Sequence, residues 1–514
     1  MLTIYEKEAG FESLDGRYAE IKRYVVDAVG QEAIHEVEQQ LFRRLQQLGR
    51  GLLEAFVARS GTGYEAGNPP VSEEGVAMEY KETPESPYGS IFGEIRIARA
   101  AYAHPAGGRV YPLDAQLNLP AHKYSYLLLK WLQAASAEQD YRGAVDRFNA
   151  IFDFSFFPDL PQRQGPPVAA YVEAFYAQVE PPSPPTEGSH IALSADSKGV
   201  RIVRREREGA VEAPGPKARR GKGEKPGLKK DAVVVTDFSF EPHARAPEEI
   251  VKGLLHQFTA PEKAQAQQER QQRRDAGQLE PREPHHKHVF ATMAGKAAAF
   301  EHLLDHVAKR DPEGHKPLIA LLDGDGSLED RLLEALRARG WEARLEVRIL
   351  DIIHASEYLW EVGTALYGEK GEQRLGWVET KLYALLDSQV GYVIGGLKQI
   401  RTKNDLKPHQ ENALDKTITY FENHRHMMDY ATYLAKGYPI ATGVVEGTCG
   451  SLVKDRMEHA GMRWSVAGAQ AVLVQRAVVK NGDWEDFWNY FIDAERERLY
   501  PIVYERAALY GKAA

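Results

Sequence analysis

Two aspartates directly follow short apolar runs in this chain. Asp196 comes after Ile-Ala-Leu-Ser-Ala, and Asp323 comes after Leu-Ile-Ala-Leu-Leu. Such runs are typical of buried strands, so each carboxylate is expected at the rim of a sheet, where α/β proteins bind ligands. Converging carboxylates repel one another unless a cation lies between them. Mg²⁺ prefers oxygen ligands, and two such ions suit phosphodiester chemistry because they activate the attacking oxygen and stabilise the leaving oxygen.

Purely structural roles are an alternative interpretation of the same aspartates. An Asp at a strand end is commonly a turn former or a helix cap. The run Asp323-Gly-Asp325-Gly also fits a turn that caps a helix beginning near Leu328, and it lacks the later ligands of a calcium loop. From spacing alone, a metal-dependent nuclease is therefore one hypothesis beside purely structural ones.

The pair Asp351 and His354 is a second candidate, since it follows the strand-like run Leu345–Leu350. Asp351 and His354 could orient a ligand or a DNA strand beside the metal site, or they could mark a strand end followed by an ordinary helix start. The cluster His285-His286-Lys-His288 has the residue types of a transition-metal site but shows no further ligand nearby.

Composition narrows the class of protein. The chain has 514 residues, 43% of them hydrophobic and 27% charged, which is typical of a soluble protein of two to four domains. It has no apolar run of the ~18 residues that span a bilayer. The single cysteine, Cys449, excludes an intrachain disulfide and cysteine-based zinc sites, and it is more typical of a small semi-buried thiol than of a nucleophile. We therefore expect a cytoplasmic protein.

Charge and motifs bear on the partners. The net charge of −9 argues mildly against a nucleic-acid partner, but residues 198–230 hold twelve Lys/Arg against four acids, and local patches decide binding. The phosphate-binding loop, the Rossmann fingerprint and the nucleophile elbow are all missing from the sequence, so no nucleotide cofactor is expected.

Hydrophobic periodicity indicates the elements that would position these residues. Residues 1–60 and 124–152 are expected to be helical, and the segment PPSPP at 181–185 is expected to be a stiff linker. Beyond it the pattern changes to a mixed α/β sheet followed by an all-helical block. The expected strands are 191–195, 200–205, 232–240, 318–322 and 345–350, and the expected helices are 246–258, 290–309, 328–339, 357–435 and 443–479.

One long motif is fairly specific. The run YPIATGVVEGTCGSLVKDRMEHAGMRWS at 438–465 resembles the third-acid helix of bacterial insertion-sequence transposases of the IS-Kra type. Asp351-Ile-Ile-His354 resembles the [C/D]-x-x-H motif of the Mutator and hAT superfamilies. The segments Ser194–Gly199 and Leu322–Gly324 resemble the first-acid and second-acid strands of these transposases. The order of these motifs fits the family over roughly residues 188–495.

The resemblance implies an α/β fold with an RNase H-like mixed-sheet core, interrupted by an all-helical insertion. It implies that Asp196, Asp323 and Glu446 bind two Mg²⁺ or Mn²⁺ ions, with Asp325 as the fallback for the second acid. The implied activity is that of a DDE transposase, which cleaves the ends of its element and joins them to target DNA.

The resemblance also implies the partners. Lys454, Arg456, Arg463 and Trp464 would face DNA, although a surface helix with one core Trp explains them as well. The partners would be element ends and target DNA, bound by a homodimer or larger assembly associated with the nucleoid, and no membrane is expected.

The N-terminal part resembles a small zinc ribbon ahead of helix-turn-helix helices, but residues 103–108 hold no cysteine where relatives place them. We therefore expect a degenerate ribbon in a mainly helical DNA-binding region. The predicted organisation is an N-terminal helical region (1–90), the ribbon-like and helix-turn-helix-like region (91–180), the linker (181–189), the first part of the catalytic core (190–356), the helical insertion (357–437) and the C-terminal helices of the core (438–514).

Two alternatives stay open. The chain could be an RNase H-fold nuclease that cuts without strand transfer, and terminal inverted repeats flanking the gene would argue against that reading. It could instead be a catalytically inert DNA-binding protein derived from a transposase, in which case substitution of Asp196 would leave its activity unchanged.

Overall fold

The computed structural model describes most of the chain. The described residues are 11–72, 75–105, 107–152, 154–183, 186–203, 229–277, 280, 283–369, 371–441, 450–458 and 461–501. Contacts divide the chain into two compact units. Unit 1 is Met1–Tyr171 with Trp484–Ala514, and unit 2 is Val172–Asp483. The last described helix therefore belongs with the N-terminal part of the chain. The prediction that it belongs with the C-terminal helices of the core is wrong.

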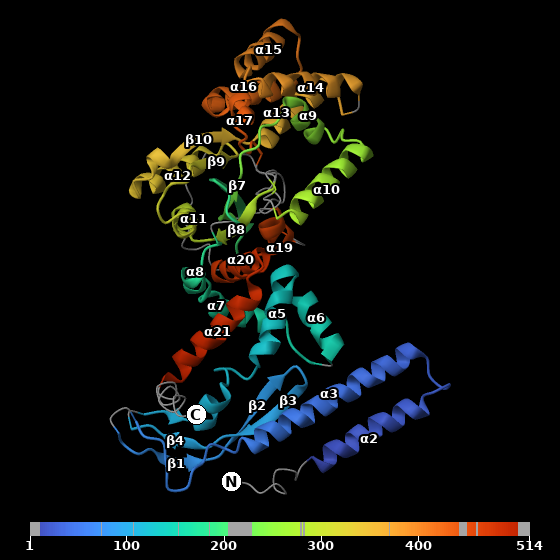
Figure 1. Ribbon diagram of the computed structural model, residues 1–514, viewed down its shortest axis with the longest axis vertical. Coiled ribbons are helices and arrows are strands. Elements are labelled where there is room, and N and C mark those ends of the chain that lie inside the picture. Colours follow the sequence, from blue (N-terminus) through green and yellow to red (C-terminus); the bar gives the residue numbers. More distant parts are fainter. Residues whose placement is uncertain are drawn as a thin grey trace. The chain divides into compact units, whose positions relative to one another are not determined.

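Unit 1 combines helices with two small antiparallel sheets. Its strands form the sheets β1-β4-β5 and β2-β3, and α2 and α3 pack side by side (Figure 1). The strands are β1 (Glu79–Glu82), β2 (Glu85–Ser90), β3 (Gly93–Ala98), β4 (Ala101–Ala103) and β5 (Arg109–Val110). The helices are α2 (Glu12–Asp27), α3 (Ile34–Arg59), α4 (Pro112–Leu117), α5 (Tyr126–Glu138), α6 (Tyr141–Phe152), α7 (Asp159–Ala169) and α21 (Trp484–Leu499).

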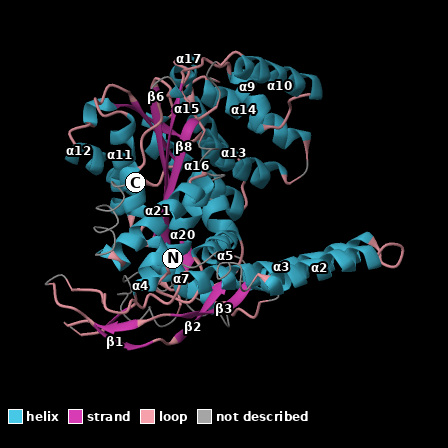
Figure 2. Cartoon of the chain, turned by 60° about the horizontal axis from the view of Figure 1, so that its bottom comes forward, coloured by secondary structure: helices cyan, strands magenta, loops and turns pink. Residues whose placement is uncertain are grey.

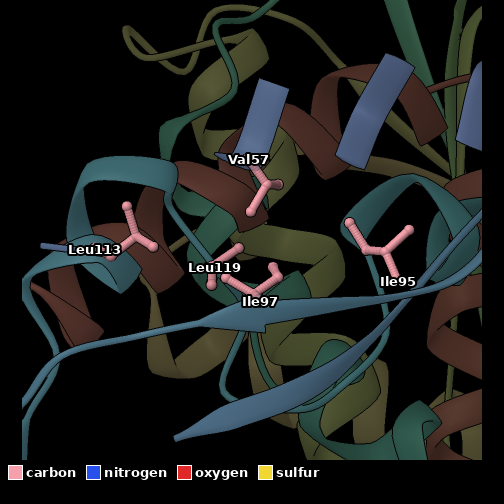
Figure 3. Close-up of a cluster of buried hydrophobic side chains, with 5 residues drawn as sticks. All are labelled: Val57, Ile95, Ile97, Leu113 and Leu119. Carbon is pink, nitrogen blue, oxygen red and sulfur yellow. The ribbon is translucent and has the colours of Figure 1, made fainter. Parts of the chain in front are cut away.

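A buried apolar cluster holds α3 against β3 in unit 1. Ile95 and Ile97 point to one face of β3 because side chains alternate along a strand. They meet Val57 of α3, and Leu113 and Leu119 complete the cluster (Figure 3). The segment expected to carry a helix-turn-helix forms α5 and α6, whose apolar faces share a second cluster with α7. Its role in DNA binding remains a prediction.

Unit 2 is built on one five-stranded mixed sheet with the order β10-β9-β6-β7-β8. The pairs β6–β7 and β7–β8 are antiparallel, whereas β6–β9 and β9–β10 are parallel. The mixed α/β architecture expected from the sequence is therefore present. The strands are β6 (His190–Arg201), β7 (Lys229–Phe240), β8 (His285–Thr292), β9 (Leu318–Leu322) and β10 (Leu345–Leu350).

Helices cover this sheet and extend beyond it (Figures 1 and 2). Both α11 and α20 pack against β8, and the helices α13 to α17, here called the helical block, follow β10. The helices up to the block are α8 (Val172–Gln178), α9 (Pro247–Leu254), α10 (Ala260–Asp275), α11 (Lys296–Arg310), α12 (Gly326–Ala338) and η3 (Glu342–Arg344). The block contains α13 (Ile352–Tyr367), α14 (Glu372–Leu386), α15 (Val390–Lys403), α16 (Pro408–His424), η4 (Arg425–Met427) and α17 (Tyr430–Ala435), and after it come η5 (Gly450–Lys454), α19 (Asp455–Met457) and α20 (Val466–Asn481).

Two expectations about the sheet were wrong. The run 191–195 and the start of the run 200–205, expected in separate strands, lie in the single strand β6, which pairs with β7 along its whole length from His190 to Arg201. Residues 204 and 205 lie outside the described residues. The expected helix 290–309 is instead the end of strand β8 followed by α11. In both cases pairing with a neighbouring strand overrides local polarity.

None of the helices in the described ranges is both long enough and apolar enough to cross a membrane.

Candidate active site

The register of the sheet places Asp196 beside Asp323. Ala195 of β6 pairs with Leu322 of β9, and the two aspartates are the next residues along these parallel strands. Every side chain of Leu318–Leu322 is buried, so β9 is fixed in the core and delivers Asp323 to the sheet edge. Both aspartates are half-buried. Their juxtaposition, expected from the apolar runs, therefore follows from parallel pairing.

The two carboxylates interact electrostatically. Burial raises the pKa of Asp323, and the negative charge of Asp196 raises it further. The backbone N–H of Asp325, which donates to Asp323 Oδ1 over 2.8 Å, and the nearby His354 act in the opposite direction. Within the described part of the chain, no Lys, Arg or His nitrogen lies within ion-pair distance of Asp196 or Asp323. The described segments therefore supply no ion-pair partner for either of these two neighbouring acids.

The carboxylate of Asp325 is engaged elsewhere. It accepts hydrogen bonds from the Ser327 N–H at 2.9 Å and from Lys296 Nζ at 2.9 Å, and it caps the N-terminus of α12. Burial works to raise the pKa of Asp325, but the hydrogen bonds from Ser327 and Lys296 outweigh it and hold the pKa below its usual value. Asp325 therefore has the helix-cap role that was the structural alternative for this turn.

Asp351 and His354 lie at the next strand over. The N–H of Asp351 donates to Leu322 O over 2.8 Å, so Asp351 continues the same row as Asp323. Asp351 is fully buried and caps α13 by accepting from the Ile353 N–H at 2.6 Å. His354, in the first turn of α13, is partly exposed and lies 3.6 Å from Glu357. His354 and Asp323 line the same cleft, so the His354 ring lies near this acid.

The helical block closes one side of this site. A cleft of about 390 Å³ opens beside Asp323 and is lined by residues from the end of β9, from α13 and from α16. Its lining is Asp323, Gly324, Asp325, His354, Glu357, Tyr358, Glu361, Lys416 and Tyr420. Sequence reasoning missed Tyr358, Lys416 and Tyr420, because nothing in their local pattern distinguishes them from ordinary helix residues.

The remaining acid of the predicted triad, Glu446, lies outside the described residues, as does Cys449. Among the described residues there is no group of three or more His, Cys, Asp or Glu side chains placed to hold a metal ion. The donor set among the described residues, two carboxylates with no ion-pair partner there, fits a divalent ion in part. A complete set of ligands needs at least one more acid.

Two of the four predicted DNA contacts are buried in this structure. The Arg456 side chain is enclosed, with its guanidinium carbon 4.7 Å from the centre of the Trp464 ring. Trp464 donates from Nε1 to Met457 O over 3.2 Å. The prediction that Arg456 and Trp464 face DNA therefore does not hold here, because both are occupied by packing. Lys454 and Arg463 are exposed, and their contact with DNA remains a prediction.

The histidines of β8 do not gather around one point. His286 Nε2 lies 2.8 Å from Thr186 Oγ1, whereas His288 Nε2 lies 3.0 Å from His302 Nε2. Together with the result of the metal-site search over the described residues, this geometry gives no support to the transition-metal hypothesis for His285, His286 and His288.

A buried ionic network that the sequence pattern did not predict lies next to these histidines. Arg310 donates to both oxygens of Glu187, at 2.7 Å each, and to Asp237 at 2.6 Å. His306 Nδ1 is 2.9 Å from the other oxygen of Asp237. Burial opposes ionisation of Asp237, but His306 and Arg310 together hold its pKa well below the usual value. The network could not be predicted from the sequence because its partners are far apart in the chain.

Comparison of the chain with models of known protein families gives no match, and comparison with curated proteins also gives none.

Proposed function

We propose that this protein is a metal-dependent DNA transposase in which Asp196, Asp323 and Glu446 are the catalytic acids. The observation that carries the proposal is the position of Asp196, within β6, beside Asp323, at the end of the parallel strand β9. The described residues supply no ion-pair partner for either acid. Two like charges held together at a sheet edge are expected where a divalent ion binds. Asp325, committed to Lys296 and to its helix, is the weaker candidate for the second acid.

The sheet supports an RNase H-like core as part of the proposal. Its first three strands along the chain are antiparallel neighbours, and the next two add in parallel beside the first, giving the order β8-β7-β6-β9-β10. The helical block is inserted after β10. The resemblance in the sequence motifs implies this same succession of first acid, second acid, Asp-x-x-His and helical insertion.

The proposed mechanism assigns a task to each side chain. Asp196 and Asp323 would hold the ions, with Glu446 as a further ligand. Bound Mg²⁺ or Mn²⁺ supplies Lewis acidity, which lowers the pKa of an attacking water or 3′-hydroxyl and stabilises the leaving oxygen. Asp351 fixes the start of α13 and so the position of His354. The protein contributes positioning and charge stabilisation, which dominate phosphoryl-type transfers.

The partners follow from the reaction. Element ends and target DNA are the proposed substrates, and the joining of two ends calls for a homodimer or a larger assembly. Phosphate contacts by the exposed Lys454 and Arg463 would contribute affinity but little sequence information. A cytoplasmic, nucleoid-associated location belongs to the same proposal. No observation here favours the nuclease or the inert DNA-binding protein over the transposase.

The decisive experiment is cleavage in vitro. Purified full-length protein is incubated with Mg²⁺ or Mn²⁺ and DNA that carries the ends of the element in which the gene lies. We expect Asp196→Ala, Asp323→Ala and Glu446→Ala to bind DNA without cutting it and Asp325→Ala to cut. Cutting without joining would favour the nuclease alternative. Equal behaviour of the wild type and all variants would reject catalysis and favour the DNA-binding alternative.

A further inference from the structure

Tyrosines from the helical block reach the ends of two sheet strands. The hydroxyl of Tyr420, on α16, donates to the backbone carbonyl of Asp323 over 2.6 Å. The hydroxyl of Tyr430, on α17, donates to Leu350 O over 2.9 Å, just before Asp351. Asp323 directly follows β9, and Leu350 is the last residue of β10, the parallel neighbour of β9. The helical block is therefore hydrogen-bonded to the backbone at the row of acids.

The ring of Tyr420 is confined on two sides. It stacks on Tyr358 with a centroid separation of 3.9 Å and an interplanar angle of 11°. On another side it lies against Gly324, where a Cβ atom would come within 2.8 Å of the ring. Gly324 has φ of +93°, which an L side chain rarely adopts. The turn after Asp323 is thus shaped to accept the Tyr420 ring.

Asp323 is fixed through its backbone as well as its side chain. Its carbonyl accepts from Tyr420, and its Oδ1 accepts from the Asp325 N–H at 2.8 Å. The first bond holds the peptide plane between Asp323 and Gly324, and the second holds the carboxylate relative to that plane.

We propose that Tyr420 is a positioning residue for Asp323, setting the orientation of its carboxylate toward a divalent ion, an inference that rests on the proposed function. Outer partners of metal ligands typically contribute 10–100-fold in metal affinity. Mg²⁺ requires near-ideal octahedral geometry, whereas larger ions tolerate distortion. Loss of the Tyr420 hydroxyl is therefore expected to weaken Mg²⁺ binding more than Mn²⁺ binding.

The stacked partner Tyr358 provides a matched control. Its hydroxyl makes no hydrogen bond to any residue in the described segments, although its ring faces the same cleft. Tyr358→Phe and Tyr420→Phe each remove one phenolic oxygen from the same stack. Only Tyr420→Phe removes a hydrogen bond to Asp323.

The experiment is titration calorimetry of Mn²⁺ and Mg²⁺ into full-length protein without DNA, with thermal unfolding measured on the same samples. We expect Tyr420→Phe to bind Mn²⁺ about 10-fold more weakly than the wild type and Mg²⁺ more weakly still. Tyr358→Phe should bind both ions like the wild type. A purely structural role for Tyr420 would lower the melting temperature and leave both affinities unchanged, which would overturn the inference.

Asp323→Ala separates this inference from the proposed function. If Asp323→Ala abolishes ion binding while Tyr420→Phe leaves it intact, the positioning role fails and the metal site stands. If Asp323→Ala binds ions like the wild type, the proposed function itself fails, and the inference fails with it. Should Tyr420→Phe not fold, Gly324→Ala displaces the Tyr420 hydroxyl from Asp323, because the added Cβ would come within 2.8 Å of it. An unchanged Mg²⁺ affinity in Gly324→Ala would then count against the inference.

Discussion

The ammonium group of Lys296 lies 2.9 Å from the carboxylate of Asp325, two residues beyond the acid that faces Asp196. Asp325 also caps α12 through the Ser327 N–H. Loss of an N-cap aspartate typically costs about 1 kcal/mol of folding free energy. We therefore expect these neighbouring acids to have separable roles, Asp325 in stability and, under the proposed function, Asp323 in catalysis.

We predict that Asp325→Ala lowers the free energy of unfolding by about 1 kcal/mol and leaves metal-dependent cleavage intact. Asp323→Ala should abolish cleavage with little loss of stability, because removing one of two repelling carboxylates relieves strain at the site. Urea unfolding and a DNA-cleavage assay on both variants test the pair. A cleavage-dead Asp325→Ala protein that is folded would transfer the second-acid role to Asp325.

Substitution of the buried Arg456 should affect stability more than substitution of the exposed Arg463. A desolvated cation–π contact is worth about 2 kcal/mol, so Arg456→Met should lower the stability by roughly that amount through loss of its contact with Trp464. Arg463→Ala should leave the stability unchanged, because the Arg463 side chain is exposed. Thermal unfolding of the two variants measures the difference, and equal melting temperatures would contradict it.

For DNA binding we expect the reverse: substitution of the exposed Arg463 or Lys454 should have a larger effect than substitution of Arg456. Each phosphate contact contributes about one unit to the slope of log affinity against log salt. We therefore expect Arg463→Ala and Lys454→Ala each to reduce that slope by about one, measured by fluorescence anisotropy over a salt series. Arg456→Met, compared at a temperature where it is folded, should keep the wild-type slope. A reduced slope in Arg456→Met alone would mean that this side chain leaves the Trp464 ring when DNA binds.

The buried histidines His288, on β8, and His302, on α11, predict that the folded protein loses stability at acidic pH. The Val289 N–H donates to Asn481 Oδ1 at 2.9 Å, so the Asn481 amide nitrogen faces His288 Nδ1, which must accept. His288 then carries its proton on Nε2 and donates to His302 Nε2. Burial, reinforced by the nearby His306, lowers the pKa of His302 to about 4. Both rings are therefore neutral at pH 7, in agreement with the lowered pKa of His288.

A lowered histidine pKa has a defined sign for stability. Between the unfolded value of about 6.5 and the folded value, the unfolded chain binds a proton that the folded chain excludes. Stability is thus fully present above about pH 6.5 and is lost as the pH falls toward 4, by about 3 kcal/mol for His302. His302→Gln, which keeps an acceptor for His288 but cannot titrate, should show a shallower loss. Urea midpoints of the wild type and His302→Gln at pH 7, 5.5 and 4.5 test this prediction. An equal loss of stability with falling pH in the two proteins would contradict it.

The parts of the fold that could be predicted from the sequence are those whose own residue pattern indicates both the type of element and its burial. Leu318–Leu322 is apolar at every position, so its strand and the position of Asp323 at its end followed directly. The helical block after β10 was also expected, since its apolar residues recur with a helical period.

Elements whose environment comes from distant partners were not predictable. The polar residues His285–His288 at the start of β8 did not indicate a strand. The strand forms because β7 pairs with it. The arrangement of Tyr420 against Asp323 joins residues 97 positions apart, and one sequence contains no record of such a contact. Arg456 was mispredicted for a different reason: its charge suggested a surface role, although the nearby Trp464 ring covers it.

The buried network around Arg310 carries the strongest stability prediction. The Arg310, Glu187 and Asp237 side chains are essentially excluded from solvent. Removing one partner of a buried ion pair usually costs about 3–5 kcal/mol, because it leaves an uncompensated charge. Arg310→Met would leave two buried carboxylates facing each other, so a loss at or above the upper end of that range is expected.

The control for Arg310→Met is Arg339→Met on the surface of the same unit. Arg339 contacts Glu301 at 2.9 Å and Asp305 at 2.6 Å, but both acids are largely exposed. Exposed pairs contribute about 0–1 kcal/mol, so Arg339→Met should unfold close to the wild-type urea midpoint. A comparable loss in both variants would show that the burial of the Arg310 network adds nothing to its contribution. A midpoint for Arg310→Met close to the wild type would show that water or local rearrangement screens Glu187 and Asp237 from each other.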